Sequence, residues 1–193
     1  MSGLNPSMNS HDIIWSLKNK LGGRVKFMGV YSADEVSNMN FHNYSSDKPY
    51  IFIANTLPSN IYSLGHWIVY YVDTKIKQIY VFDSYGLDPR VYTQYFKRFF
   101  NNHPSFKIWY NIKRLQAEDS YVCGLYAVHA TKTITNKGLN YFLQYIDRGW
   151  SFNNYRHNDR KIVRLTNIHT LPNYCHKTFC PHITFRECKN LYC

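Results

Sequence analysis

The chain has 193 residues and a formal net charge of +11, from 23 Lys and Arg against 12 Asp and Glu. With a hydrophobic content of 45%, it is long enough for one domain with a buried core. It has no run of about eighteen apolar residues, which excludes a transmembrane helix. The N-terminus lacks the apolar stretch of a secretory signal, so we expect a chain that is not secreted and does not depend on structural disulfides.

Turn residues and apolar periodicity divide the chain into helices and strands. Asn9 or Ser10 is a capping type for a first helix at about 11–21, which Gly22-Gly23 would end. Asp88-Pro89 is typical of a helix start, and the aromatic stripe that follows, over about 90–101, is expected in the core. The other elements are expected at these approximate positions: a loop at 34–49, strands at 50–56, 67–72, 78–83 and 106–112, and helices at 124–134 and 138–147.

The order of these elements predicts the fold class. A helix, three strands, a helix, a strand and further helices indicate an α+β domain with a central mixed β-sheet packed against helices. The periodic elements end near residue 150. We therefore expect a main domain at residues 1–150 and a C-terminal extension at 151–193, which packs on that domain or is partly independent.

The positive charge indicates a polyanion as partner, and nucleic acid is the obvious candidate. The many aromatic residues among Lys and Arg would also suit stacking on single strands. The alternative is that the charge serves solubility and reflects a coding bias toward Lys, Asn, Tyr and Ile.

A predicted β-hairpin brings a histidine and an aspartate together. A turn centred between Thr74 and Lys75 sets His66 directly opposite Asp83, with Cβ atoms about 5 Å apart. A carboxylate at that distance fixes the tautomer of an imidazole and stabilises the imidazolium. A slip of one residue would put the two side chains on opposite faces. Because the chain has nine histidines, some His–acid pair across a hairpin is also expected by chance.

Two further residues complete a set with the chemistry of thiol hydrolysis. Cys123 is expected at a helix N-terminus, after the capping types Asp119-Ser120, where the helix dipole favours a thiolate nucleophile. The alternative is a small buried hydrophobe. Gln116 is seven residues earlier (123 − 116) and its amide, with the Cys123 backbone N–H, would stabilise an oxyanion. Together with His66 as base and Asp83 as its orienting group, these residues predict a cysteine protease.

The segments around these residues resemble adenovirus-type cysteine endopeptidases, the adenain family, which are distantly related to the proteases that process SUMO. The resemblance is carried by three segments and covers roughly residues 9–150. The separations from His66 to Asp83 and from Gln116 to Cys123 are those of adenain, whereas the SUMO-processing relatives usually have a gap one residue shorter before the cysteine. The three segments are Gly65-His66-Trp67, Tyr80 to Gly86, and Gln116 to Tyr126.

This resemblance implies a papain-related fold with a permuted order of catalytic residues. It implies a thiol protease that cleaves viral precursor or capsid proteins next to glycine during virion maturation, as a late protein. It also implies DNA as an activator, no cofactor for the chemistry itself, and work in the virion and the host cell, in the nucleus or a cytoplasmic virus factory. The implied source is a virus, a virophage or a virus-like mobile element.

The chain departs from adenain at two positions. Asp83 stands where adenain usually has Glu, and either carboxylate can orient an imidazole. Ser105 stands where adenain has the Cys that tethers an activating peptide, so we expect no disulfide-tethered peptide there. Trp67 either contributes a cation–π contact to the imidazolium or packs in the core.

Two other functions remain open: a cysteine protease that removes ubiquitin or SUMO, and a basic DNA-binding virion protein with an inactive protease fold. Four cysteines lie near the C-terminus, with His176 and His182 among them. They lack Cys-x2-Cys spacing, so we expect free thiols, or disulfides formed after release from the cell, rather than structural zinc. These cysteines are Cys175, Cys180, Cys188 and Cys193.

Overall fold

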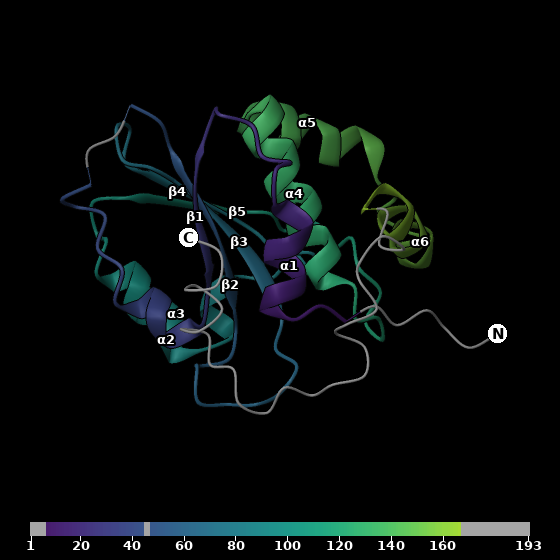
Figure 1. Ribbon diagram of the computed structural model, residues 1–193, viewed down its shortest axis with the longest axis horizontal. Coiled ribbons are helices and arrows are strands. Elements are labelled where there is room, and N and C mark those ends of the chain that lie inside the picture. Colours follow the sequence, from purple (N-terminus) through teal and green to yellow (C-terminus); the bar gives the residue numbers. More distant parts are fainter. Residues whose placement is uncertain (1–6, 45–46, 167–193) are drawn as a thin grey trace.

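A five-stranded mixed β-sheet forms the centre of the molecule in the computed structural model, which describes residues 7–44 and 47–166 (Figure 1). The outer pairs, β1 with β2 and β4 with β5, are parallel, while β3 is antiparallel to both of its neighbours. The predicted α+β class with a mixed sheet is confirmed. The strands lie side by side in chain order: β1 (Lys26–Tyr31), β2 (Tyr50–Asn55), β3 (Trp67–Asp73), β4 (Gln78–Phe82) and β5 (Lys107–Tyr110).

Helices cover both faces of the sheet, and each face has its own apolar core (Figure 1). Strand β2 is buried along its whole length, because Ile51 and Ile53 face one core while Phe52 and Ala54 face the other. The helices over the first core are α1 (Ser10–Leu17), α4 (Cys123–Lys137), α5 (Leu139–Gly149) and α6 (Tyr155–Thr166). The helices over the second core are α2 (Ala33–Ser37) and α3 (Gln94–Asn101).

The β3–β4 hairpin forms where the sequence predicts it. Asp73 pairs with Gln78, and the carboxylate of Asp73 accepts hydrogen bonds from the N–H groups of Lys75 and Ile76 in the turn. Lys77 takes a positive φ of 51°, which lets the chain reverse within these four residues. The hairpin centre therefore lies between Lys75 and Ile76, one position after the predicted centre.

The predicted extents of two N-terminal segments are wrong. The first helix does not reach residue 21, because it ends at Leu17 and Asn19 then takes a positive φ of 57°. The expected loop at 34–49 overlaps α2, which spans Ala33–Ser37. There the N-cap Ser32 and the N3 residue Glu35 form a capping box, which starts a helix of five residues that is too short to show periodicity.

Three other elements differ from the prediction. The helix expected at 90–101 is divided into a 3₁₀ turn, η1 (Pro89–Val91), and α3, because Thr93 caps a new helix start. Strand β1 was not predicted, since Gly29 and a register shift beside it break the alternation of side chains. Helix α6 was not predicted either. It packs against α4. The division into domains at residue 150 stays a prediction. None of the described helices is long and apolar enough to cross a membrane.

Candidate active site

His66 lies directly before β3 and is fixed against the end of β2. Its N–H donates to Thr56 Oγ1 at 2.9 Å, and the Thr56 N–H donates to the His66 carbonyl at 2.9 Å. The preceding residue must be glycine here, because a Cβ on Gly65 would lie 1.8 Å from Asn55 Oδ1. Contacts of the backbone at Gly65 and His66 with the end of β2 thus fix where the imidazole begins.

Asp83 lies directly after β4, fully buried, and its carboxylate accepts hydrogen bonds from four groups. His66 Nε2 lies 2.6 Å from Oδ1, and the Tyr85 N–H donates to the same oxygen at 2.9 Å. Oδ2 accepts from the Leu87 N–H at 3.0 Å and from the Tyr92 hydroxyl at 2.8 Å. A carboxylate with so many donors is held rigidly in its charged form.

The structure corrects the predicted register of this pair. Val69 pairs with Phe82, so His66 and Asp83 are diagonal neighbours, two positions away from direct opposition. The shift follows from the turn, whose centre is one residue later than predicted. Side chains alternate with a period of two, so a displacement of two residues keeps both on the same face. The two side chains therefore meet although the predicted register is wrong.

The electrostatics of the pair favour an imidazolium. Burial lowers the pKa of His66, but hydrogen bonds to Asp83 and to Cys123, and the charges of both, outweigh it and raise that pKa to about 9. Burial raises the pKa of Asp83, but the hydrogen bond and charge of His66 and the N–H groups of Tyr85 and Leu87 hold it below its usual value. At neutral pH the His66 ring is therefore an imidazolium, and it is paired with the Asp83 carboxylate.

Cys123 is the first residue of α4, and its side chain lies close enough to the imidazole of His66 to raise the pKa of that ring. The cysteine is buried, with 9% of its surface exposed. The expectation that Asp119-Ser120 caps this helix is wrong: the N-cap is Val122, which offers no side-chain acceptor. The uncapped helix start leaves backbone N–H groups beside the sulfur that can bind an anion.

Gln116 lies in the wall of this site, fully buried. Its Oε1 accepts from Ser84 Oγ at 2.6 Å, and its Nε2 donates to the Ser120 carbonyl at 2.8 Å and to the Tyr85 hydroxyl at 3.2 Å. Both N–H bonds of the amide are thus occupied. The structure brings His66 and Asp83 into direct contact and places Cys123 beside the imidazole. Gln116 is linked to them through Tyr85, which stacks on His66.

Two tyrosines enclose the imidazole, and the sequence did not indicate them. Tyr85 stacks on His66 with ring centroids 4.7 Å apart, and Tyr92 stacks on it at 5.3 Å. Tyr92 belongs to the aromatic stripe that was expected in the core. Of the alternatives for Trp67, the structure favours packing: the ring is 5% exposed and its Nε1–H donates to the Met8 carbonyl at 2.8 Å. Aromatic contact with His66 comes from the tyrosines.

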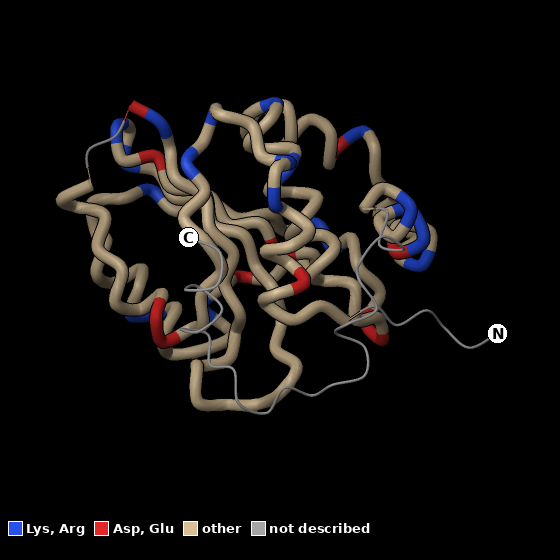
Figure 2. The backbone as a smooth tube through the Cα atoms, viewed as in Figure 1, with Lys and Arg blue, Asp and Glu red and all other residues tan. Residues whose placement is uncertain are grey.

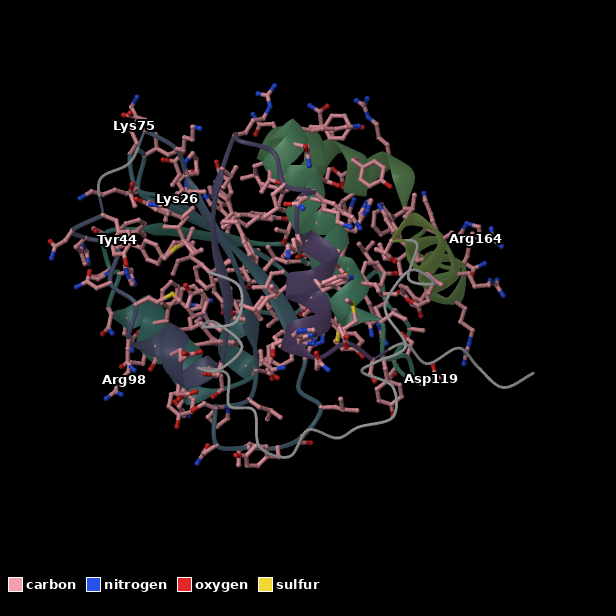
Figure 3. All side chains as sticks on the ribbon, in the orientation of Figure 1. Lys26, Tyr44, Lys75, Arg98, Asp119 and Arg164 are labelled. Carbon is pink, nitrogen blue, oxygen red and sulfur yellow. The ribbon has the colours of Figure 1, made fainter. Side chains whose placement is uncertain are left out.

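Figure 3 shows the side chains on the ribbon. Among the described residues, no group of three or more His, Cys, Asp or Glu is placed to hold a metal ion. The four C-terminal cysteines, Cys175 to Cys193, lie outside the described residues.

A family model identifies the chain. Residues 40–162, more than half of the chain, match the Ulp1 protease family, C-terminal catalytic domain. The chain belongs to the Ulp1 protease family. The matched range includes His66, Asp83, Gln116 and Cys123. The predicted kinship with SUMO-processing and adenain-type enzymes, and the prediction of a cysteine protease, are confirmed at this level. No curated protein matches the chain in sequence.

Comparison with solved structures finds similar chains at low sequence identity, and the first of them shows the same fold. The central domain of Lpg1148 from Legionella pneumophila is 16% identical, with a TM-score of 0.54, over 83% of this chain and 96% of that one. The ASFV pS273R protease is 13% identical, with a TM-score of 0.48, over 86% and 67%. The C-terminal Ulp1 protease domain, solved with the yeast SUMO ortholog Smt3, is 14% identical, with a TM-score of 0.46, over 83% and 76%.

Membership of the Ulp1 family makes the chain a hydrolase that acts on protein substrates through a cysteine. Enzymes of this kind need no metal or organic cofactor, because the thiolate supplies the nucleophile and the imidazolium supplies the proton.

Proposed function

We propose that this Ulp1-family protease is an endopeptidase in which Cys123 attacks the peptide carbonyl carbon and His66 handles the protons. The new S–C bond forms as the carbonyl π electrons move to oxygen. The C–N bond then breaks, and His66 donates its proton to the leaving amine nitrogen. Water next attacks the thioester, His66 takes the proton of that water, and the acid product and free Cys123 are released.

One observation carries this proposal: His66 lies 2.6 Å from the Asp83 carboxylate, and the Cys123 side chain lies beside the same imidazole, close enough to raise its pKa. That arrangement supplies a nucleophile, a proton carrier and a group that orients the carrier. The same contacts keep the imidazole in one orientation, which removes an entropic cost from the reaction.

The oxyanion would be bound by the backbone N–H of Cys123 at the open start of α4. Gln116 supplies the second donor in this proposal. Its Nε2 already donates to Ser120 and Tyr85, so substrate binding must exchange one of these hydrogen bonds for one to the oxyanion. The exchange costs little if the new acceptor is charged, since such hydrogen bonds are the stronger ones.

The proposed substrates are precursor or capsid proteins of a virus or virus-like element, cut next to glycine during virion maturation. The resemblance of the catalytic segments to adenain supports this. On the same ground we propose that the enzyme works in the virion and the host cell, in the nucleus or a cytoplasmic virus factory. The family match also favours a second candidate, removal of a ubiquitin-like protein such as SUMO, because Ulp1 proteases act on such conjugates.

Nucleic acid is proposed as a further partner. The outward face of α6 carries Arg156, Arg160 and Arg164, which repeat every fourth residue and form a row along the helix. Figure 2 shows this concentration of blue on α6. Arg156 is paired with Asp119 at 2.6 Å, so Arg160 and Arg164 are the better candidates for contacts with phosphates.

The proposed function is tested by incubating candidate precursor proteins, with and without DNA, with the wild type and with Cys123→Ala. Mass spectrometry would then locate the cleavage sites. Cleavage beside glycine by the wild type alone supports the endopeptidase. Labelling of Cys123 by a SUMO or ubiquitin C-terminal probe, without precursor cleavage, favours the deconjugating enzyme. Retained DNA binding with no alkylation of Cys123 at neutral pH would leave an inactive protease fold that binds DNA.

A further inference from the structure

Met8, far from the catalytic residues in sequence, contacts the residues that follow two of them, His66 and Cys123. Its carbonyl accepts the indole N–H of Trp67 at 2.8 Å, and Trp67 follows His66. Its side chain lies over Gly124, which follows Cys123: a Cβ on that glycine would be 2.8 Å from the Met8 Cβ and 3.2 Å from its Sδ. Met8 is 4% exposed and belongs to the same apolar core as Cys123 and Trp67.

These contacts join two layers of the molecule at the site. His66 and Asp83 stand at the end of the sheet, whereas Cys123 stands at the start of α4, so the distance from sulfur to imidazole depends on how the helix rests on the sheet. Met8 lies between β3 and α4, bonded to one and packed on the other. Loss of its side chain would leave space at the point where the helix start is held against the sheet.

The local backbone makes Met8 a fixed contact. The next residue, Asn9, forms a capping box with Asp12: the Asp12 N–H donates to Asn9 Oδ1 at 2.9 Å and the Asn9 N–H donates to Asp12 Oδ2 at 3.0 Å. This box sets the angle at which the chain enters α1, and it aims the Met8 carbonyl at Trp67. On the other side of Met8, position 124 must be glycine, because a side chain there would push Met8 away.

We propose that Met8 is a positioning residue, which holds His66 and Cys123 in contact by bracing Trp67 against Gly124. This inference rests on the proposed thiol chemistry, in which both side chains must stay within hydrogen-bond reach. A displacement of about 1 Å between reacting groups costs up to a hundredfold in rate without changing the binding of substrate. The prediction is therefore a loss in kcat rather than in KM.

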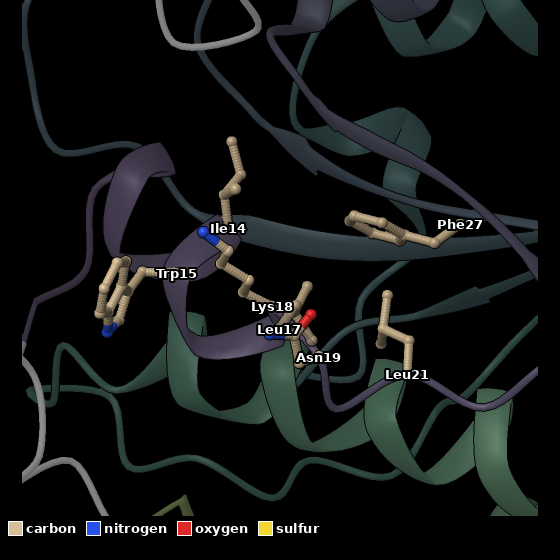
Figure 4. A pocket seen from close by; sticks show the side chains of 7 residues that line it. All are labelled: Ile14, Trp15, Leu17, Lys18, Asn19, Leu21 and Phe27. Carbon is tan, nitrogen blue, oxygen red and sulfur yellow. The ribbon is translucent and has the colours of Figure 1, made fainter. Parts of the chain in front are cut away.

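Three variants test it. Met8→Ala removes the side chain over Gly124, and Trp67→Phe removes the indole donor but keeps an aromatic ring. Leu17→Ala is the matched control, because Leu17 is also buried, at 2% exposure, on the helix that begins just after Met8. It also lines a surface hollow of about 330 Å³ beside α1 (Figure 4), which involves none of the catalytic residues.

Two readouts separate positioning from general stability. The first is kcat and KM on a cleaved peptide, measured below the Tm of every variant. The second is the pH dependence of iodoacetamide alkylation at Cys123, followed by mass spectrometry of the peptide that contains it. Alkylation needs no substrate, so it tests the inference even if the proposed cleavage specificity is wrong.

We expect Met8→Ala to lower kcat by about tenfold or more, with KM within about twofold, and to move the midpoint of alkylation to higher pH. Trp67→Phe should act in the same direction and keeps the test valid if Met8→Ala does not fold. Leu17→Ala should lower Tm alone. The inference is overturned if both site variants keep the wild-type kcat and alkylation profile, or if Leu17→Ala shifts them equally. The proposed function would instead be overturned if His66→Gln and the wild type showed the same Cys123 alkylation.

Discussion

The hydroxyl of Tyr92 donates a hydrogen bond to Asp83 Oδ2 at 2.8 Å, while the ring of the same tyrosine stacks on His66. Tyr92→Phe keeps the ring and removes this donor. A hydrogen bond to a charged group is worth about 1.5–3 kcal/mol, so we expect kcat/KM to fall by about tenfold or more as the carboxylate becomes less firmly oriented. Steady-state kinetics on a cleaved peptide provides the measurement.

Tyr95→Phe is the control for this change, because Tyr95 lies on the same segment but is 36% exposed and has no contact with the catalytic residues among the described interactions. It should keep the wild-type kcat/KM. Equal rates for Tyr92→Phe and the wild type would show that the hydroxyl does not help to orient Asp83.

The raised pKa of His66 makes the stability of the fold depend on pH. Burial lowers that pKa, but the bonds to Asp83 and Cys123 raise it to about 9, whereas an unfolded histidine titrates near 6.5. The pair therefore stabilises the fold fully below about pH 6.5, and this contribution, at most about 3 kcal/mol, is lost as the pH rises through about 9.

Urea unfolding of the wild type and of His66→Gln at several pH values measures this contribution. The free energy of unfolding of the wild type should exceed that of the variant most near pH 6, and the difference should shrink toward pH 10. Titrations shared by both proteins cancel in the difference. A difference that stays constant over this range would mean that His66 is not held as an imidazolium.

Asp83→Asn should abolish most activity although it preserves shape. The buried carboxylate accepts hydrogen bonds from His66, Tyr92 and two backbone N–H groups, and an amide has a single oxygen to accept them. We expect kcat to fall by a factor on the order of 10²–10⁴. Asp88→Asn, which alters an aspartate paired with the half-exposed Arg90, should leave kcat unchanged. A small effect at Asp83 would indicate that other contacts suffice to orient the imidazole.

Local patterns made the central hairpin predictable, while long-range packing decided details of the site. The β-branched and aromatic runs on either side of Asp73 to Lys77 specify two strands and their turn, and these bring His66 near Asp83. The sequence did not reveal that Lys77 would accept a positive φ, which moved the register by two residues. His66 and Asp83 still meet, because a shift of two residues leaves both side chains on the same face of the sheet.

The partners of Gln116 and His66 were beyond the reach of sequence patterns. Gln116 bonds to Ser84 and Tyr85, more than thirty positions earlier in the chain, and its occupied amide follows only from how the segment before α4 packs beside β4. Tyr92 has the apolar spacing of a core residue, but Thr93 starts a new helix there and leaves Tyr92 free to turn toward the imidazole. A cap that interrupts a helical stripe is the one signal that would have indicated it.

Gly65→Ala tests whether the close approach of Gly65 to the Asn55 side chain fixes the position of His66. An added Cβ would lie 1.8 Å from Asn55 Oδ1, and that oxygen already accepts the Leu57 N–H at 2.9 Å, so neither side moves without losing a contact. We expect a loss of about 1–3 kcal/mol in the free energy of unfolding and a fall in kcat as His66 moves. Gly23→Ala, where the nearest atom is the flexible Lys48 Nζ at 3.9 Å, should change neither quantity. If Gly65→Ala matches this control in thermal unfolding and kinetics, the close approach to Asn55 does not position His66.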